Sequence, residues 1–182
     1  MSNIFQFTLI LDGVDENTPG LEDSLYEAGC DDALINFKNG TVYLDFDREG
    51  DDLEKTILTA IKDIESSDLG AKIVSVAPEH LVSLTEIADR ASITKQAISL
   101  FVQGERRTGD FPHPVLKIAN KSPLWRWSAV AKWLYQHGKI NDVKVVEAAN
   151  IVEDINAALE FRIKNSLEHK QKIFKELTQQ FV

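Results

Sequence analysis

A short stretch near the middle of the chain carries hydroxyl, amide and ammonium side chains at the start of a predicted helix, and two guanidinium side chains just past its end. In chain order these candidates for binding are Thr94, Lys95, Gln96, Ser99, Arg106 and Arg107. Amide and ammonium groups can donate hydrogen bonds to the edges of DNA bases, and guanidinium groups pair with phosphates. The chemistry that this stretch could do is therefore binding to a nucleic acid.

Two predicted helices joined by a sharp turn must position these side chains. Ala88 is small where the second helix would cross close to the first, and Ser92 and Ile93 occupy the turn. Thr94 is placed to cap the second helix with its hydroxyl. Apolar residues expected to hold the two helices together are Ile87, Ile98 and Phe101. The pattern predicts a helix-turn-helix, and its alternative is an ordinary pair of packed helices.

The segment that follows cannot be helical through Pro112 and Pro114. Residues 115–118 and 124–127 are predicted as two short strands of a hairpin, or wing, and Ser128 as the cap of a further helix. Further candidates for phosphate contact are Lys117, Lys121 and Arg126, with solvated surface charge as the alternative. Three tryptophans are predicted to pack in the core rather than to stack on single-stranded nucleic acid; they are Trp125, Trp127 and Trp133.

The whole of TEIADRASITKQAI, FPHPVLKI and the W-x-W-x-x-x-x-x-W pattern resembles small bacterial winged helix-turn-helix proteins. The pattern is similar to that of the AlpA and excisionase regulators and, more distantly, to that of the MerR family. The resemblance covers residues 80–140 and implies that the second helix enters the major groove while the wing contacts the backbone or the minor groove. It implies groove or phosphate contact for 94–96 and 99, phosphate contact for 106 and 107, and wing positions for 117, 121 and 126. The sequence departs from the pattern at Ser92, where glycine is common.

Charge is divided unevenly along the chain, whose formal net charge is −9. Residues 1–79 contain 18 acidic and 5 basic residues, a net of −13. Residues 80–140 contain 4 acidic and 9 basic residues, a net of +5, and residues 141–182 have a net of −1. Because the local field governs attraction to phosphate, the acidic total does not exclude nucleic-acid binding by the middle segment.

The first 78 residues are predicted to form a ferredoxin-like βαββαβ sandwich. Alternating apolar residues indicate strands at 4–11, 33–37, 41–46 and 72–76, with a hairpin turn at Asn39-Gly40. One helix is expected to start at Thr18-Pro19, and a second to run from Asp51-Asp52 until Gly70 ends it. The fold class is therefore α+β.

Acidic residues at alternate positions, Asp45, Asp47 and Glu49, resemble the start of a calcium-binding loop. The closing glutamate is absent because Thr56 stands at its position. A solvated acidic turn followed by helix N-terminal carboxylates is therefore the favoured interpretation.

Residues 142–182 contain no proline or glycine and place apolar residues at steps of three and four. This predicts about forty residues of helix, broken once near Lys170. Its apolar stripe could pack on the chain's own domains, but we favour homodimerisation through the C-terminal helices. Three domains are thus expected, at 1–78, 79–140 and 141–182.

Other classes of function find little support. Four widely spaced histidines and the absence of phosphate-binding or dinucleotide motifs predict no metal, no cofactor and no enzyme. Cys30, the single cysteine, is expected to be packed and fits a reducing cytoplasm. No signal peptide and no apolar run long enough for a membrane span are recognised.

The leading hypothesis is a sequence-specific double-stranded DNA-binding protein, a bacterial transcriptional regulator acting as a dimer. The alternative is a protein-interaction module, or an antitoxin-type adaptor, in which the acidic N-terminal domain binds a basic partner. A third hypothesis, that this domain senses a small ligand, has no convergent polar site in the sequence to support it.

Overall fold

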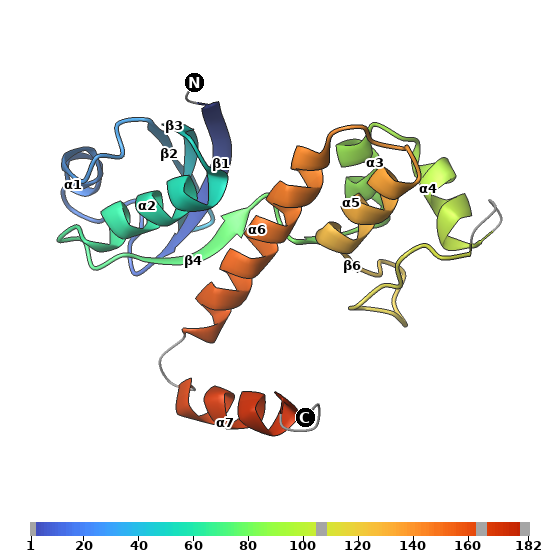
Figure 1. Cartoon of the computed structure of the whole chain (residues 1–182). Coiled ribbons are helices and arrows are strands. Elements are labelled where there is room, and N and C mark those ends of the chain that lie inside the picture. The colour runs from blue at the N-terminus through green and yellow to red at the C-terminus, as the bar shows by residue number, and fades with distance from the viewer. Residues whose placement is uncertain (1–2, 105–108, 163–166, 179–182) are drawn as a thin grey trace. The chain divides into compact units, whose positions relative to one another are not determined.

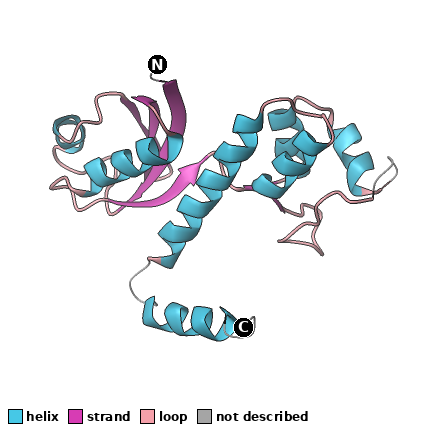
Figure 2. Cartoon of the chain, in the orientation of Figure 1, coloured by secondary structure: helices cyan, strands magenta, loops and turns pink. Residues whose placement is uncertain are grey.

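The structure is a computed structural model, and it describes residues 3–104, 109–162 and 167–178. It has a mixed α+β fold (Figures 1 and 2). Contacts divide the chain into two units, one of residues 1–76 with 154–182 and one of residues 77–153. The division falls inside a C-terminal helix, whereas the sequence places a domain boundary between residues 140 and 141.

The first unit is built on a four-stranded antiparallel sheet. Its elements are β1 (Asn3–Asp12), α1 (Leu21–Glu27), β2 (Ala33–Lys38), β3 (Thr41–Gly50), α2 (Leu53–Glu65) and β4 (Lys72–Ala77), so the predicted βαββαβ order is confirmed. The strand order across the sheet is β2-β3-β1-β4. Because successive side chains of a strand alternate between faces, one face carries the buried core. Its central residues are Phe7, Leu9, Leu11, Val42, Leu44 and Phe46.

The β2–β3 hairpin turns where the sequence predicts it. Asn39 and Gly40 both have positive φ, 54° and 78°. Two consecutive left-handed residues define a type I′ turn, whose twist matches that of the flanking strands. The hairpin fixes the register that places Ile35 opposite Leu44.

Helix α1 begins later than predicted. Gly20 precedes it with φ 70° and ψ 15°, and the helix starts at Leu21. Thr18 does not cap the helix, because its hydroxyl accepts a hydrogen bond from the Asp15 N–H at 2.9 Å. The expectation of a Thr18 cap with proline at the first helical position was wrong, since a local turn uses this hydroxyl.

Helix α2 is capped as expected by Asp52, whose side chain accepts a hydrogen bond from the Lys55 N–H at 2.9 Å. Its C-cap is Ser66, so the helix ends before Gly70. Gly70, with φ 68°, instead lies in the connection to β4. The predicted helix end was therefore placed too late.

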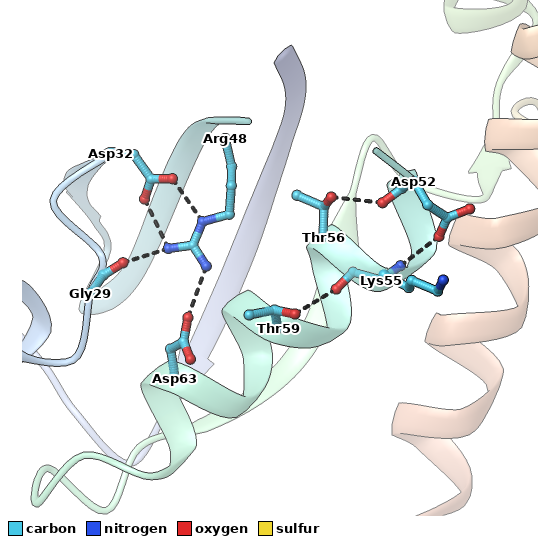
Figure 3. A network of polar contacts seen from close by, with 8 residues as sticks. All are labelled: Gly29, Asp32, Arg48, Asp52, Lys55, Thr56, Thr59 and Asp63. Carbon is cyan, nitrogen blue, oxygen red and sulfur yellow. Dashed lines mark hydrogen bonds and ion pairs between the residues drawn. The ribbon is translucent and has the colours of Figure 1, made fainter. Parts of the chain in front are cut away.

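A buried guanidinium ties three parts of this unit together (Figure 3). Arg48 on β3 donates to Asp32 at 2.7 Å, to Asp63 on α2 at 3.0 Å and to the Gly29 carbonyl at 2.7 Å. Cys30 beside it is packed, as predicted, and burial raises the pKa of its thiol to about 11. The network links the sheet, α2 and the loop before β2.

The acidic residues that resemble a calcium loop lie in strand β3 instead of a turn. Asp45 accepts hydrogen bonds from Thr8 and Asn36, at 2.6 and 2.9 Å, and Asp47 accepts one from Gln6 at 2.8 Å. A strand spreads alternate side chains along one face and cannot wrap them around an ion. Asp45 lies in a strand and Asp52 at the start of α2, as predicted, but the acidic turn expected between them was wrong for Asp47 and Glu49, because strand pairing with β1 extends to Gly50.

The C-terminal segment forms two helices, α6 (Val143–Phe161) and α7 (Leu167–Thr178). The break expected near Lys170 was wrong, since Lys170 lies within α7. Two apolar residues of the stripe that the sequence predicts over 142–182, Ile163 and Phe181, fall outside the described residues. In α6 the apolar stripe is buried by the chain itself, at Ala149, Val152, Ile155 and Leu159. In α7, Ile173, Phe174 and Leu177 are exposed. None of the described helices is long and apolar enough to cross a membrane.

Asn156 joins α6 to the edge of the sheet. Its amide donates to the Val76 carbonyl and accepts from the Val76 N–H, both at 2.8 Å. Arg162 then bonds to Glu65 and to the Ile73 carbonyl. Side chains of this segment therefore form hydrogen bonds with backbone groups of β4.

Candidate nucleic-acid interface

The second unit contains the two predicted helices, α3 (Leu84–Ala91) and α4 (Lys95–Val102). Helix α3 starts with a capping box, in which Ser83 accepts from the Glu86 N–H at 3.3 Å and Glu86 accepts from the Ser83 N–H at 2.6 Å. Hydrogen bonds from Ser83 lower the pKa of the Glu86 carboxyl. The reciprocal bonds fix where α3 begins and so where its C-terminal turn falls.

The turn between the helices is tight. Ser92 adopts the left-handed conformation, φ 53° and ψ 39°, and the Ile93 N–H donates to the Ala88 carbonyl at 2.9 Å. Ala88 is buried and Ile93 packs partly against the core of this unit. Serine thus adopts the backbone geometry for which glycine is the common residue.

Helix α4 presents a mixed surface, as predicted. Thr94 caps it by accepting a hydrogen bond from the Ala97 N–H at 3.2 Å. Ile98 and Phe101 are buried against the core, with 0% and 7% exposure. Lys95 and Gln96 on the outer side are exposed, and Ser99 is half-buried. The helix therefore offers a short polar face whose orientation is fixed by its buried side.

Both helices pack on α5 (Trp127–Gln136) and on a short two-stranded sheet. The sheet pairs β5 (Leu81–Val82) with β6 (Trp125–Arg126). The three tryptophans are buried, as predicted, with exposures of 1%, 7% and 6% for Trp125, Trp127 and Trp133. Trp133 also donates to Asp110 at 3.0 Å, and Trp125 donates to the Pro112 carbonyl at 2.9 Å. These bonds fix Asp110 and Pro112 to the core of the unit.

The predicted wing is reduced to one bridge. Leu116 pairs with Leu124, and their backbone bonds measure 3.3 and 3.0 Å. The two predicted strands were wrong, because residues 125 and 126 pair with β5 instead and Trp127 already begins α5. For the same reason Ser128 is not the helix cap, and the position belongs to Arg126. Lys117, with φ 53°, and Lys121 are exposed on the loop that the bridge closes.

Arg126 differs from the other basic candidates. Its guanidinium forms an ion pair with Glu153 on α6, and the Ser128 hydroxyl donates to the same carboxylate. Its side chain is 51% exposed, whereas that of Glu153 is 16% exposed. The charge of Arg126 is therefore compensated within the unit.

Arg90 is a basic residue that sequence reasoning missed. It donates to the Glu79 carbonyl at 2.8 Å, and its guanidinium lies 5.4 Å from the Trp127 ring centroid. Its side chain is 19% exposed, and its bond to Glu79 links the first residues of the unit to α3. No short-range spacing links these three positions, so only the fold reveals the contact.

The candidate residues therefore separate into four groups. Thr94, Lys95, Gln96 and Ser99 share α4, Lys117 and Lys121 share the 116–124 loop, and Arg126 is paired. Arg106 and Arg107 lie outside the described residues. Within the described ranges, no group of three or more histidine, cysteine or acidic side chains could hold a metal ion. Comparisons with protein-family models, curated proteins and solved structures give no match to this chain.

Proposed function

We propose that residues 77–153 bind double-stranded DNA with α4 in the major groove, and that the chain acts as a sequence-specific DNA-binding regulator. The observation that carries this proposal is that α4 has one exposed polar side and one buried apolar side. Lys95 and Gln96 are exposed at its first turn, while Ile98 and Phe101 fix its inner side. A helix that is held on one side and offers amide and ammonium groups on the other suits contact with base edges.

The arrangement of elements supports a finer description of both units. The α3–turn–α4 unit with its bridged loop favours a reduced winged helix-turn-helix, in which Lys117 and Lys121 contact phosphates. The β2-β3-β1-β4 order of the first unit favours a ferredoxin-like sandwich. The net charge of +5 over residues 80–140 supports phosphate binding by the winged helix-turn-helix.

The proposal is tested by selecting binding sites from a randomised duplex pool with the full chain. Affinity for the enriched site is then measured by fluorescence anisotropy across a salt series. We expect one enriched sequence and an affinity that falls steeply with salt. An absence of enrichment, with no duplex binding at about 100 mM salt, would overturn the proposal, because phosphate contacts still contribute in this regime.

Single substitutions separate base contact from general attraction. Gln96→Ala should cost about 1–3 kcal/mol on the selected site and relax preference at one base pair. Lys132→Ala on α5 is the control for Lys95→Ala, because Lys132 is also exposed but lies outside the candidate set. Equal effects of the two lysine substitutions would count against binding through α4.

We also propose that the chain binds as a homodimer through its C-terminal helices. The exposed apolar residues of α7, Ile173, Phe174 and Leu177, support this. Sedimentation equilibrium of the full chain should give a dimer, and Phe174→Glu should shift it toward monomer. Tyr26→Glu, at an exposed aromatic residue of α1, is the control. A monomeric wild-type chain at tens of micromolar would overturn dimerisation while leaving DNA binding by α4 intact.

A further inference from the structure

The two edges of the first unit's sheet differ. At the β4 edge, Asn156 binds both backbone groups of Val76, and Arg162 binds the Ile73 carbonyl. At the other edge, no strand of the described chain pairs with the outer side of β2. An unpaired edge is a template for a further strand unless charge or covering segments block it. β2 has Leu34 and Phe37 exposed, at 66% and 41%.

On the face of the sheet away from the core, carboxylates lie next to this edge. Leu34 of β2 stands opposite Asp45 of β3, and Asp47 follows two residues along the same strand. Thr8, Asn36 and Gln6 donate hydrogen bonds to these two carboxylates. Neutral donors orient a carboxylate without cancelling its charge. Within the described ranges, no lysine or arginine forms an ion pair with Asp45 or Asp47.

On the opposite face, an open hollow of about 280 Å³ reaches Phe37 at the end of β2. Its acidic lining consists of Glu16, Glu22 and Asp23, and the exposed ring of Phe37 supplies apolar surface. This combination suits a lysine or arginine, whose aliphatic stem covers apolar surface while its charged end meets carboxylates. Both faces beside the β2 edge thus offer negative charge.

We propose that β2 accepts a basic, extended segment of a partner protein as a fifth strand of the sheet. Backbone hydrogen bonds to β2 supply the affinity, and alternate side chains enter the two acidic faces. Lysine or arginine on one face reaches toward Asp45 and Asp47, and on the other toward the hollow beside Phe37. The site is separate from the proposed DNA-binding surface and does not depend on it.

Charge selects this occupant over two others. A second copy of β2 would contribute one cation, Lys38, and would bring its own Asp45 and Asp47 toward those of the first copy. A nucleic acid would be repelled by a segment of net charge −13 over residues 1–79. A basic strand alone matches both the open edge and the charge of its two faces.

The test uses the full chain and three synthetic octapeptides, namely alternating Lys–Val, alternating Glu–Val and alternating Lys–Gly. We expect the Lys–Val peptide to bind, with amide hydrogen exchange slowed at residues 33–38. The Glu–Val peptide should not bind, and the Lys–Gly peptide should bind about tenfold more weakly, because glycine disfavours a strand. Equal binding of the two lysine peptides, or unchanged exchange in β2, would overturn strand addition.

Variants locate the site. Leu34→Lys places a like charge at the edge and should weaken Lys–Val binding about tenfold. Leu58→Lys on α2, at a residue 46% exposed, is the control and should leave binding unchanged. Asp45→Asn with Asp47→Asn should weaken binding about fivefold, since each exposed pair contributes little alone. Two outcomes would overturn the proposal. One is an equal loss of Lys–Val binding in the Leu34 and Leu58 variants, and the other is self-association of the chain that Leu34→Lys abolishes and Leu58→Lys does not.

Discussion

Arg126 and Glu153 form an ion pair across 27 positions of sequence. Arg126 precedes α5, and Glu153 reaches it from α6, where the Ser128 hydroxyl also donates to the carboxylate. Among the basic candidates for phosphate contact within the described residues, Arg126 is the one held by an acidic partner. The carboxylate therefore competes with any phosphate for this guanidinium.

Replacing Glu153 should strengthen DNA binding if the proposed function is correct. Glu153→Ala frees Arg126 for phosphate, so we expect affinity about threefold tighter at 100 mM salt and a salt slope larger by about one. Anisotropy titrations across a salt series measure both quantities. Glu147→Ala removes the same charge from an exposed position on the same helix and is the control. Identical gains in the two variants would show that net charge alone is responsible.

Removing the buried guanidinium of Arg48 should lower the free energy of unfolding more than removing an exposed cation. Arg48→Met leaves Asp32 and Asp63 without the guanidinium that both bind in Figure 3. We expect the free energy of unfolding to fall by about 3 kcal/mol, measured by urea denaturation. Adding Asp32→Asn to the variant should recover part of the loss. Lys62→Met, at an exposed position on α2, provides the baseline, and a loss no larger than this baseline would contradict the prediction.

Features set by neighbouring residues could be predicted from the sequence. The strand alternation, the Asn39-Gly40 turn and the caps at Asp52 and Thr94 depend on groups within a few positions of one another. The exposure of Lys95 and Gln96 follows in the same way from helical spacing against Ile98. Local chemistry therefore defined the α4 part of the candidate interface.

Features that depend on distant partners could not be predicted. The second wing strand was misassigned because Trp125 and Arg126 pair with β5, more than forty positions earlier. The cap at Ser128 failed because α5 already begins at Trp127, directly after the residues that pair with β5. An alternating pattern shows that a segment is extended but does not identify the strand with which it pairs. For the same reason, the sequence does not show that the charge of Arg126 is paired with Glu153.

Acid should weaken the attachment of α6 to the sheet through Glu65. Burial alone would raise the pKa of Glu65, but hydrogen bonds from Arg162 and from the Ile73 N–H outweigh it and lower the pKa from 4.5. A lowered pKa in the folded state means that stability is present above about pH 4.5 and is lost as the pH falls below it. Glu65→Gln should therefore cost about 1 kcal/mol at pH 7, a value reduced by the exposure of Arg162, and progressively less below pH 4. Urea denaturation of both proteins at pH 7 and pH 3.5 measures the difference. A cost that does not change with pH would contradict the assignment.

Two substitutions of Ser92, the left-handed residue between α3 and α4, should change the free energy of unfolding in opposite directions. Ser92 has φ 53° and is exposed, so replacing it with glycine removes little buried side-chain surface. Ser92→Gly relieves the steric cost of a Cβ in this conformation and should raise the free energy of unfolding by about 0.5 kcal/mol. Ser92→Val adds a branched Cβ and should lower it by about 1 kcal/mol. Thermal and urea denaturation of the full chain measure both changes, and DNA affinity should follow folding alone, because Ser92 lies in the turn before α4. If Ser92→Gly lowers stability while Ser92→Val leaves it unchanged, the turn between the two helices does not hold the left-handed geometry on which the orientation of Lys95 and Gln96 depends.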